Sequence, residues 1–103
     1  MRLISRKTLI RFWEKRPETE QSLKSWYDEI ANAFWSSPNE LKVQFSNASV
    51  ISTKRVVFNI HGDKYRLVVD SEYKIGIVFI VWIGTHKEYD KINVKEIKYV
   101  KTN

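Results

Sequence analysis

Residues 55–70 read RVVFNIHGDKYRLVVD, two apolar runs on either side of a polar turn. Apolar side chains alternate within each run, which predicts two half-buried strands. A two-residue turn at Gly62-Asp63 would make them an antiparallel hairpin. Counting outward from that turn gives the facing pairs of the core side: Ile60 with Tyr65, Phe58 with Leu67, and Val56 with Val69. A one-residue slip would turn all six side chains into water, so this register is strongly favoured.

The opposite face of the same hairpin carries the polar residues. The facing pairs expected there are Asn59 with Arg66, Val57 with Val68, and Arg55 with Asp70. An arginine and an amide on neighbouring strands of an open sheet surface could grip a phosphate through charge-assisted hydrogen bonds. Each of these two residues alone would be an ordinary exposed side chain.

A third strand is expected at residues 77–83, IVFIVWI, after a turn near residues 74–76. This run is apolar on both faces, which is typical of a strand in the interior of a sheet. The hairpin and this strand together predict a small antiparallel sheet.

The first half of the chain has a helical period instead. A first helix is predicted from Lys7 to about Lys15, because the residue before Pro17 disfavours helical geometry. Pro17 is suited to the first turn of a second helix, in which Glu20 and Lys24 can pair one turn apart. The apolar positions of that helix are Leu23, Trp26, Tyr27, Ile30 and Phe34, and Trp13, Trp26 and Phe34 are interpreted as core residues. Residues 36–39 close the helical half, and residues 41–49 are expected to be irregular.

These patterns predict an α+β fold in which two N-terminal helices pack on a small antiparallel β-sheet, as a single domain spanning residues 1–103. The net charge of +6 suggests a polyanionic partner such as nucleic acid, although charge alone fits a protein that is merely soluble equally well. The chain has no cysteine and two histidines, which disfavours disulfides and a metal centre. No signal peptide or membrane-spanning run is recognised, so a cytoplasmic protein is expected.

Residues 83–92, IGTHKEYDKI, gather polar chemistry directly after the last strand. His86 has a side-chain type that moves protons near neutral pH, and Tyr89 could stack on a base or contact a phosphate. Taken one at a time, an ordinary surface histidine and a tyrosine that covers the sheet edge are the favoured interpretations, whereas the residues together on one face favour a functional site. No phosphate-binding glycine loop, metal-ligand pair or nucleophile signature accompanies them, so a bound cofactor is not expected.

Two motifs give the chain a family resemblance. Residues 62–67, GDKYRL, together with residues 85–90, THKEYD, resemble the HigB-type mRNA interferase toxins of bacterial toxin–antitoxin systems, within the RelE/ParE superfamily. The opening MRLISRKTLIRFWEKRPE and the tryptophan-bearing second helix are similar to that family as well. The resemblance implies a RelE-like fold, cleavage of mRNA during translation on the ribosome, and a helix-turn-helix antitoxin of the HigA type as partner.

The resemblance also implies roles for single residues. Arg66 matches the superfamily arginine that binds the scissile phosphate, and Tyr89 lies near the tyrosine that contacts RNA. His86 falls where many RelE-type members have an arginine. Val57 and Asn59 stand where RelE-type toxins present lysines, and Asp63 stands where asparagine is frequent, which leaves the general base open.

The expected activity is therefore metal-independent endoribonuclease cleavage, in which the ribose 2′-hydroxyl of the RNA is the nucleophile. Arg66, His86 and Tyr89 are the candidate catalytic residues, with His86 as proton donor to the leaving 5′-oxygen. The candidate RNA-binding residues are Lys54, Arg55, Asn59, Lys87 and Lys91. Two alternatives remain: a noncatalytic nucleic-acid or ribosome-binding module, and a ParE-like toxin that targets DNA gyrase.

Overall fold

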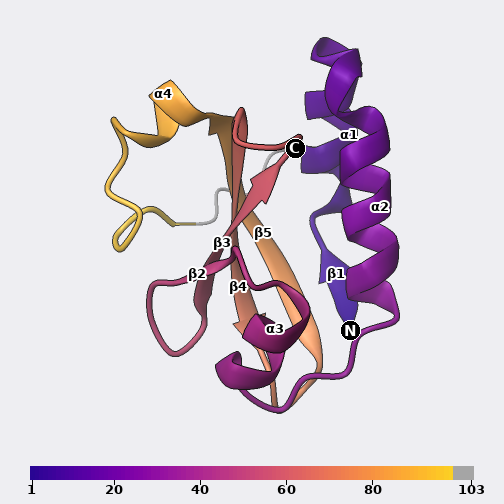
Figure 1. Ribbon diagram of the computed structural model, residues 1–103, viewed down its shortest axis with the longest axis vertical. Helices are drawn as coiled ribbons and strands as arrows, with labels where there is room; N and C mark the ends of the chain where they lie inside the picture. The colour runs from indigo at the N-terminus through magenta and orange to yellow at the C-terminus, as the bar shows by residue number, and fades with distance from the viewer. Residues whose placement is uncertain (99–103) are drawn as a thin grey trace.

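The computed structural model describes residues 1–98 and combines four α-helices with one sheet (Figure 1). The elements in chain order are β1 (Arg2–Ile4), α1 (Arg6–Lys15), the 3₁₀ helix η1 (Pro17–Thr19), α2 (Glu20–Ala31), α3 (Pro38–Gln44), β2 (Ser49–Val50), β3 (Arg55–Ile60), β4 (Tyr65–Glu72), β5 (Ile77–Thr85) and α4 (His86–Tyr89). The five strands form a single sheet in the order β1-β5-β4-β3-β2. The α+β class expected from the sequence is confirmed.

The β3–β4 hairpin has the predicted register at all six pairs, from Ile60 opposite Tyr65 to Arg55 opposite Asp70. At the turn, His61 and Gly62 both have positive φ, 54° and 67°. Glycine reaches that region without steric cost, whereas histidine does so rarely. The alternating apolar residues therefore outweigh the local preference of His61 and hold the hairpin in this register.

Strand β1 was not predicted, and it makes the sheet mixed. It pairs in parallel with β5, from Arg2 opposite Ile77 to Ile4 opposite Phe79, while the other neighbouring strands are antiparallel. Three residues are too short for a period to be recognised, and a parallel partner that lies more than seventy residues away leaves no local signal.

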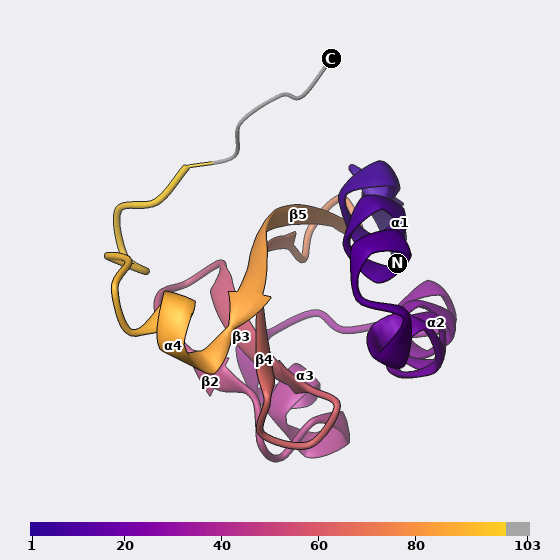
Figure 2. The same cartoon turned by 90° about the horizontal axis from the view of Figure 1, so that it is seen from above.

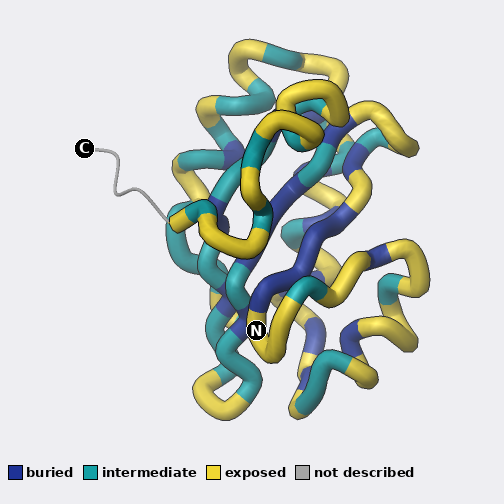
Figure 3. The backbone as a smooth tube through the Cα atoms, turned by 90° about the vertical axis from the view of Figure 1, so that its left-hand side faces the viewer, coloured by how far each residue is buried: buried dark blue, intermediate teal, exposed yellow. Residues whose placement is uncertain are grey.

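Helices α1 and α2 lie on one side of the sheet, and α4 lies on the other (Figures 1 and 2). The main core fills the space between the helices and the sheet, and the dark blue buried segments of Figure 3 follow the central strands. Its fully buried side chains include Leu9, Leu23, Ile30, Leu41, Leu67 and Ile80. The Glu20–Lys24 ion pair predicted on α2 is present, at 2.9 Å.

Two expectations for the helical half are wrong. Phe34 is 97% exposed, because α2 ends at Ala31 and the backbone beyond it directs Trp35 into the core instead. Residues 38–44, part of which was expected to be irregular, form α3. The hydroxyl of Ser37 accepts a hydrogen bond from the backbone amide of Glu40, Pro38 occupies the first turn, and Leu41 is buried. Ser-Pro followed by glutamate is a helix start signal that the sequence contained.

The second face of the sheet is not the open surface that was expected. Val57, Val68 and Val81 form a second buried cluster there. Partly buried side chains from β2–β3, β5, α4 and the C-terminal segment cover it: Ile51, Trp82, Tyr89, Val94 and Ile97. At the end of this face nearest the hairpin turn, Asn59 remains exposed and Arg66 partly so.

A β-bulge in β5 determines what stands opposite Arg66. Val69 pairs with Ile80, but Val68 pairs with Trp82, so Val81 is the extra residue. Two neighbours, Val81 and Trp82, thus contact the same second cluster, which a regular strand does not allow. The shift of one residue brings Gly84 opposite Arg66.

Candidate active site at the end of the hairpin

Arg66 lies near the end of β4 with its guanidinium only partly exposed. Its Nη1 donates to the backbone carbonyls of Asp63 and Tyr65 at 3.0 and 3.2 Å, and its Nη2 lies 3.2 Å from the Asp63 carboxylate. The side chain is 11% exposed, so the fork is oriented before any ligand arrives. Asp63, which in the sequence was only a departure from the family pattern, is thus a direct partner of Arg66.

Helix α4 presents His86 to this arginine. Thr85 caps the helix: its hydroxyl accepts from the amide of Glu88 at 3.1 Å, while the Glu88 carboxylate accepts from the amide of Thr85 at 2.8 Å. The hydrogen bond from the Thr85 backbone amide is the main cause that lowers the pKa of Glu88, and the Thr85 side chain lowers it further. The pattern threonine-x-x-glutamate is a capping box, and it could have located the helix from the sequence.

His86 and Arg66 are in contact through their side chains. The Nη2 of Arg66 lies 3.2 Å from Nδ1 of His86, and the backbone amide of His86 donates to the carbonyl of Lys64 at 3.0 Å. Arginine has no acceptor atom, so this contact requires an unprotonated Nδ1. Its other ring nitrogen, Nε2, lies 3.6 Å from the Asp90 carboxylate.

The indole of Trp82 occupies space that is free because Gly84 has no side chain. A Cβ on Gly84 would lie 2.5 Å from Cη2 and 2.6 Å from Cζ2 of Trp82, and 3.0 Å from Oε1 of Glu88. The indole therefore fills the position opposite Arg66 that a side chain at residue 84 would take. Trp82 was not predicted as a site residue, because its ring occupies the space beside Gly84 only through the bulge and the missing side chain.

Tyr89 lies on the same short helix as His86, and its ring packs against Trp82 with centroids 6.3 Å apart. It also belongs to the side chains that cover the second cluster. The Tyr89 ring is half buried. It can therefore cover the sheet with one part and leave another part accessible to RNA.

The predicted RNA-binding residues fall into two groups. Asn59 is exposed and directly opposite Arg66 on β3, while Lys87 and Lys91 are exposed on α4 and just after it. Arg55 begins β3 at its far end, roughly 13 Å along the strand from Asn59 at 3.3 Å per residue, and Lys54 directly precedes it. Only the first group adjoins Arg66 and His86.

At that far end, both basic residues have acidic partners. Lys54 pairs with Glu72 at 3.1 Å. Arg55 holds Asp70 through two hydrogen bonds of 2.8 Å, and its Nη1 donates to the carbonyls of Val94 and Ile97. The hydrogen bond to Asp70 is the main cause that raises the pKa of Arg55. Arg55 thereby fastens the C-terminal segment to the sheet.

Within residues 1–98, no group of three histidine, aspartate or glutamate side chains is placed to hold a metal ion. The helices of this part of the chain are too short or too polar to cross a membrane. The arrangement that remains is an oriented arginine, a histidine in contact with it and an aromatic ring beside them, which can bind an anionic group and exchange a proton with it.

Comparison with known proteins identifies the family. The family model described as HigB_toxin, RelE-like toxic component of a toxin-antitoxin system, matches residues 19–92. The chain is 32% identical over 92 residues to the mRNA interferase toxin HigB of Escherichia coli K12, a match that covers 87% of this chain and 88% of the relative. The proteins named mRNA interferase HigB from Escherichia coli O157:H7 and Shigella flexneri match equally well. The chain belongs to the HigB family of RelE-like toxins, the toxic components of toxin–antitoxin systems.

Proposed function

We propose that this protein is a cytoplasmic endoribonuclease that cleaves mRNA on the translating ribosome, and that a helix-turn-helix antitoxin of the HigA type neutralises it. The observation that carries the proposal is the 3.2 Å contact between Arg66 Nη2 and His86 Nδ1, at the accessible end of the sheet. The family membership and the names of the relatives support the choice of mRNA as substrate.

The chemistry assigned to the chain is transfer of a phosphoryl group within the RNA. The ribose 2′-hydroxyl attacks the adjacent phosphorus, the bond to the 5′-oxygen breaks, and the products are a 2′,3′-cyclic phosphate and a free 5′-hydroxyl. Arg66 would hold the phosphate and stabilise the charge that develops on its oxygens. The proton from the 2′-hydroxyl leaves to a base, and the 5′-oxygen receives a proton from an acid.

His86 is proposed as the acid, and the resting geometry adds a condition. While Arg66 donates to Nδ1, the ring cannot carry a proton there. A phosphate that enters between the two side chains would accept from Arg66 and free Nδ1 to be protonated. Substrate binding therefore converts His86 from a partner of Arg66 into a donor toward the leaving oxygen.

The RNA contacts proposed beside this pair are Asn59, Lys87, Lys91 and Tyr89, which all adjoin the hairpin end. Lys54 would contribute only to the general positive field, because it is distant along β3 and paired with Glu72. For Arg55 we propose a structural role in place of RNA binding, since its guanidinium is committed to Asp70 and to two backbone carbonyls.

Single-turnover cleavage of a ribosome-bound message tests the two roles. Arg66→Ala should lower the rate at least about a hundredfold at every pH, and Arg66→Lys should recover little because a lysine lacks the fork. His86→Gln should slow cleavage while RNA affinity stays nearly unchanged. The matched controls are Arg11→Ala on the exposed face of α1 and His61→Gln at the hairpin turn, which should cleave as the wild type does.

The wild-type rate should also fall as pH rises across the range in which histidine loses its proton, if chemistry limits the rate. Normal cleavage by His86→Gln would remove the histidine from the mechanism and turn attention to Tyr89 or a lysine. In growing bacteria, induction of the protein should stop translation before replication. The reverse order, with intact transcripts, would favour the gyrase-targeting alternative.

A further inference from the structure

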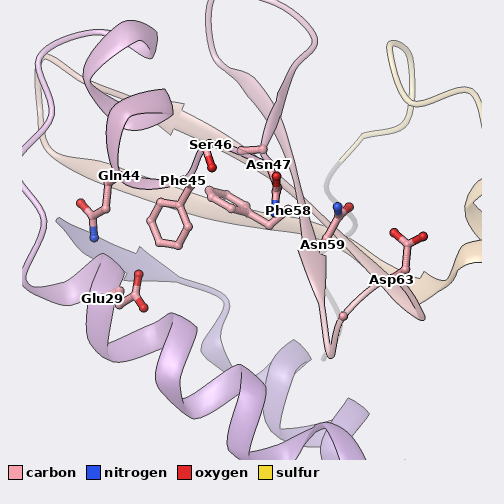
Figure 4. A pocket seen from close by; sticks show the side chains of 10 residues that line it. Glu29, Gln44, Phe45, Ser46, Asn47, Phe58, Asn59 and Asp63 are labelled. Carbon is pink, nitrogen blue, oxygen red and sulfur yellow. The ribbon is translucent and has the colours of Figure 1, made fainter.

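A pocket of about 610 Å³ opens along the outer edge of β3, between α2, α3 and the hairpin turn (Figure 4). Strand β2 pairs only with Val56 and Val57, so the edge of β3 from Phe58 to Ile60 has no strand partner among residues 1–98. The residues around the pocket are Glu29, Gln44, Phe45, Ser46, Asn47, Ala48, Phe58, Asn59, Gly62 and Asp63.

The lining of this pocket is acidic and polar, although the protein as a whole has a net charge of +6. It contains the carboxylates of Glu29 and Asp63 and three side-chain amides, and none of the described lysines or arginines lines it. Phe45 lies against Phe58 with ring centroids 5.0 Å apart, and both rings point into the pocket in Figure 4. A phosphate would be repelled here, whereas a flat, uncharged group with N–H donors would find acceptors and an aromatic surface.

The pocket is continuous with the site of the proposed phosphate contact. Asn59 stands directly opposite Arg66 across the hairpin, one strand spacing of about 4.8 Å away. The Asp63 carboxylate, which lines the pocket, lies 3.2 Å from Nη2 of Arg66. A polynucleotide whose phosphate is held by Arg66 would thus bring a neighbouring nucleotide to the mouth of the pocket.

We propose that the pocket receives one nucleobase beside the cleaved bond and selects bases that carry an exocyclic amino group. This inference rests on the endoribonuclease function proposed above. Carboxylates only accept hydrogen bonds, so they favour the two N–H donors of the amino groups of adenine, cytosine and guanine over uracil, whose single N3–H donor stands between two carbonyl oxygens. The exposed part of Phe45 offers the base a face to stack on.

A basic side chain of a protein partner is the competing occupant, because it too would satisfy the two carboxylates. The RNA base is favoured because Asn59 and Asp63 belong both to the pocket and to the surroundings of Arg66. If a side chain of a protein partner filled the pocket, Asn59 and Asp63 would not need to lie next to Arg66 as well.

The test is a set of ribosome-bound messages that differ in one base at each position next to the cut, cleaved under single-turnover conditions. The wild type should cut messages with an amino-bearing base at one of these positions about tenfold faster than those with uridine there. Glu29→Gln and Asn47→Ala should each move that ratio toward one. Glu14→Gln, which neutralises an exposed carboxylate on α1, should keep the wild-type ratio.

Cleavage by the wild type without any base preference would overturn the base pocket and leave the endoribonuclease function intact. The same conclusion follows if both pocket variants keep the wild-type ratio. If Glu29→Gln instead keeps the ratio and loses affinity for the purified antitoxin, the pocket receives a protein side chain and the inference is wrong. Absence of any cleavage by the wild type would overturn the proposed function and this inference together.

Discussion

Replacing Gly84 by alanine should damage the site by pushing the Trp82 indole away from Arg66. Gly84 does not have a positive φ, so an alanine there meets no backbone strain. The added Cβ would instead lie 2.5 and 2.6 Å from two indole carbons and 3.0 Å from the Glu88 carboxylate that caps α4. Contacts this short cannot persist, and Trp82 must move.

The size of the effect follows from two opposing contributions. Forcing one extra methyl group into an occupied position costs about 1–3 kcal/mol. Replacing a glycine lowers the conformational entropy of the unfolded chain, which raises the free energy of unfolding by roughly 0.4–1 kcal/mol. The net loss in the free energy of unfolding should be about 1.5 kcal/mol, which for a chain of this size lowers Tm by roughly 6–12 °C. The cleavage rate of the folded variant should fall about tenfold, because small displacements of the groups that contact the substrate lower the rate strongly.

Urea denaturation and single-turnover cleavage below the unfolding transition would measure both effects. Gly76→Ala is the matched control: nothing lies within 4 Å of its new Cβ, and its φ of +66° makes it lose stability through backbone strain alone. It should cleave normally when folded, because it lies at the other end of β5. Trp82→Phe removes both clashing carbons, so Gly84→Ala should cost less than about 0.5 kcal/mol in that background.

The steric reasoning is refuted if Gly84→Ala is as stable as the wild type. It is refuted equally if the loss persists unchanged beside Trp82→Phe, since the clash would then not be the cause. A destabilised variant that cleaves at the wild-type rate would show that the indole does not help to position Arg66.

Three further substitutions test other contacts. Thr85→Ala removes the cap of α4 and should lower the free energy of unfolding by about 1 kcal/mol in urea titration; an unchanged midpoint would mean that the cap contributes nothing. Arg55→Ala leaves Asp70 without its partner and should cost about 3 kcal/mol while the folded protein keeps its RNA affinity, and a loss of affinity at unchanged stability would return Arg55 to the RNA-binding group. The Tyr65 hydroxyl, 2.7 Å from Glu18, lowers the pKa of that carboxyl. Its stabilisation is therefore present above the usual carboxyl pKa and is lost as pH falls through the lowered value, so Tyr65→Phe should lose less stability on acidification than the wild type.

Much of the candidate site could be predicted because its residues are close to strong local patterns. The hairpin register placed Asn59 opposite Arg66, and the end of the apolar run placed His86 at the start of the next element. The side-chain partners of Arg66 could not be predicted from the sequence. Asp63 meets it only through the geometry of the turn, and the unprotonated Nδ1 of His86 follows from a distance that no sequence period encodes.

The sequence by itself determined the elements whose periodicity is long or whose burial is one-sided. Alternating valines and aromatics leave the β3–β4 hairpin one register, and the helical spacing in residues 20–31 leaves α2 one buried face. The short segments β1 and α3 were not predicted. They are held in place by tertiary packing and capping more than by their own propensity.

Only the tertiary structure decided which residues share the candidate site at the end of the sheet. The bulge at Val81 shifts β5 by one residue, so that Gly84 faces Arg66 and the Trp82 ring fills the space left by the missing side chain. The same fold uses Arg55 to tie residues 94–97 over the second face, which turns a predicted open surface into a covered one. Register shifts and buried ion pairs of this kind depend on the packing of segments distant in sequence, and that packing exists only once the whole chain has folded.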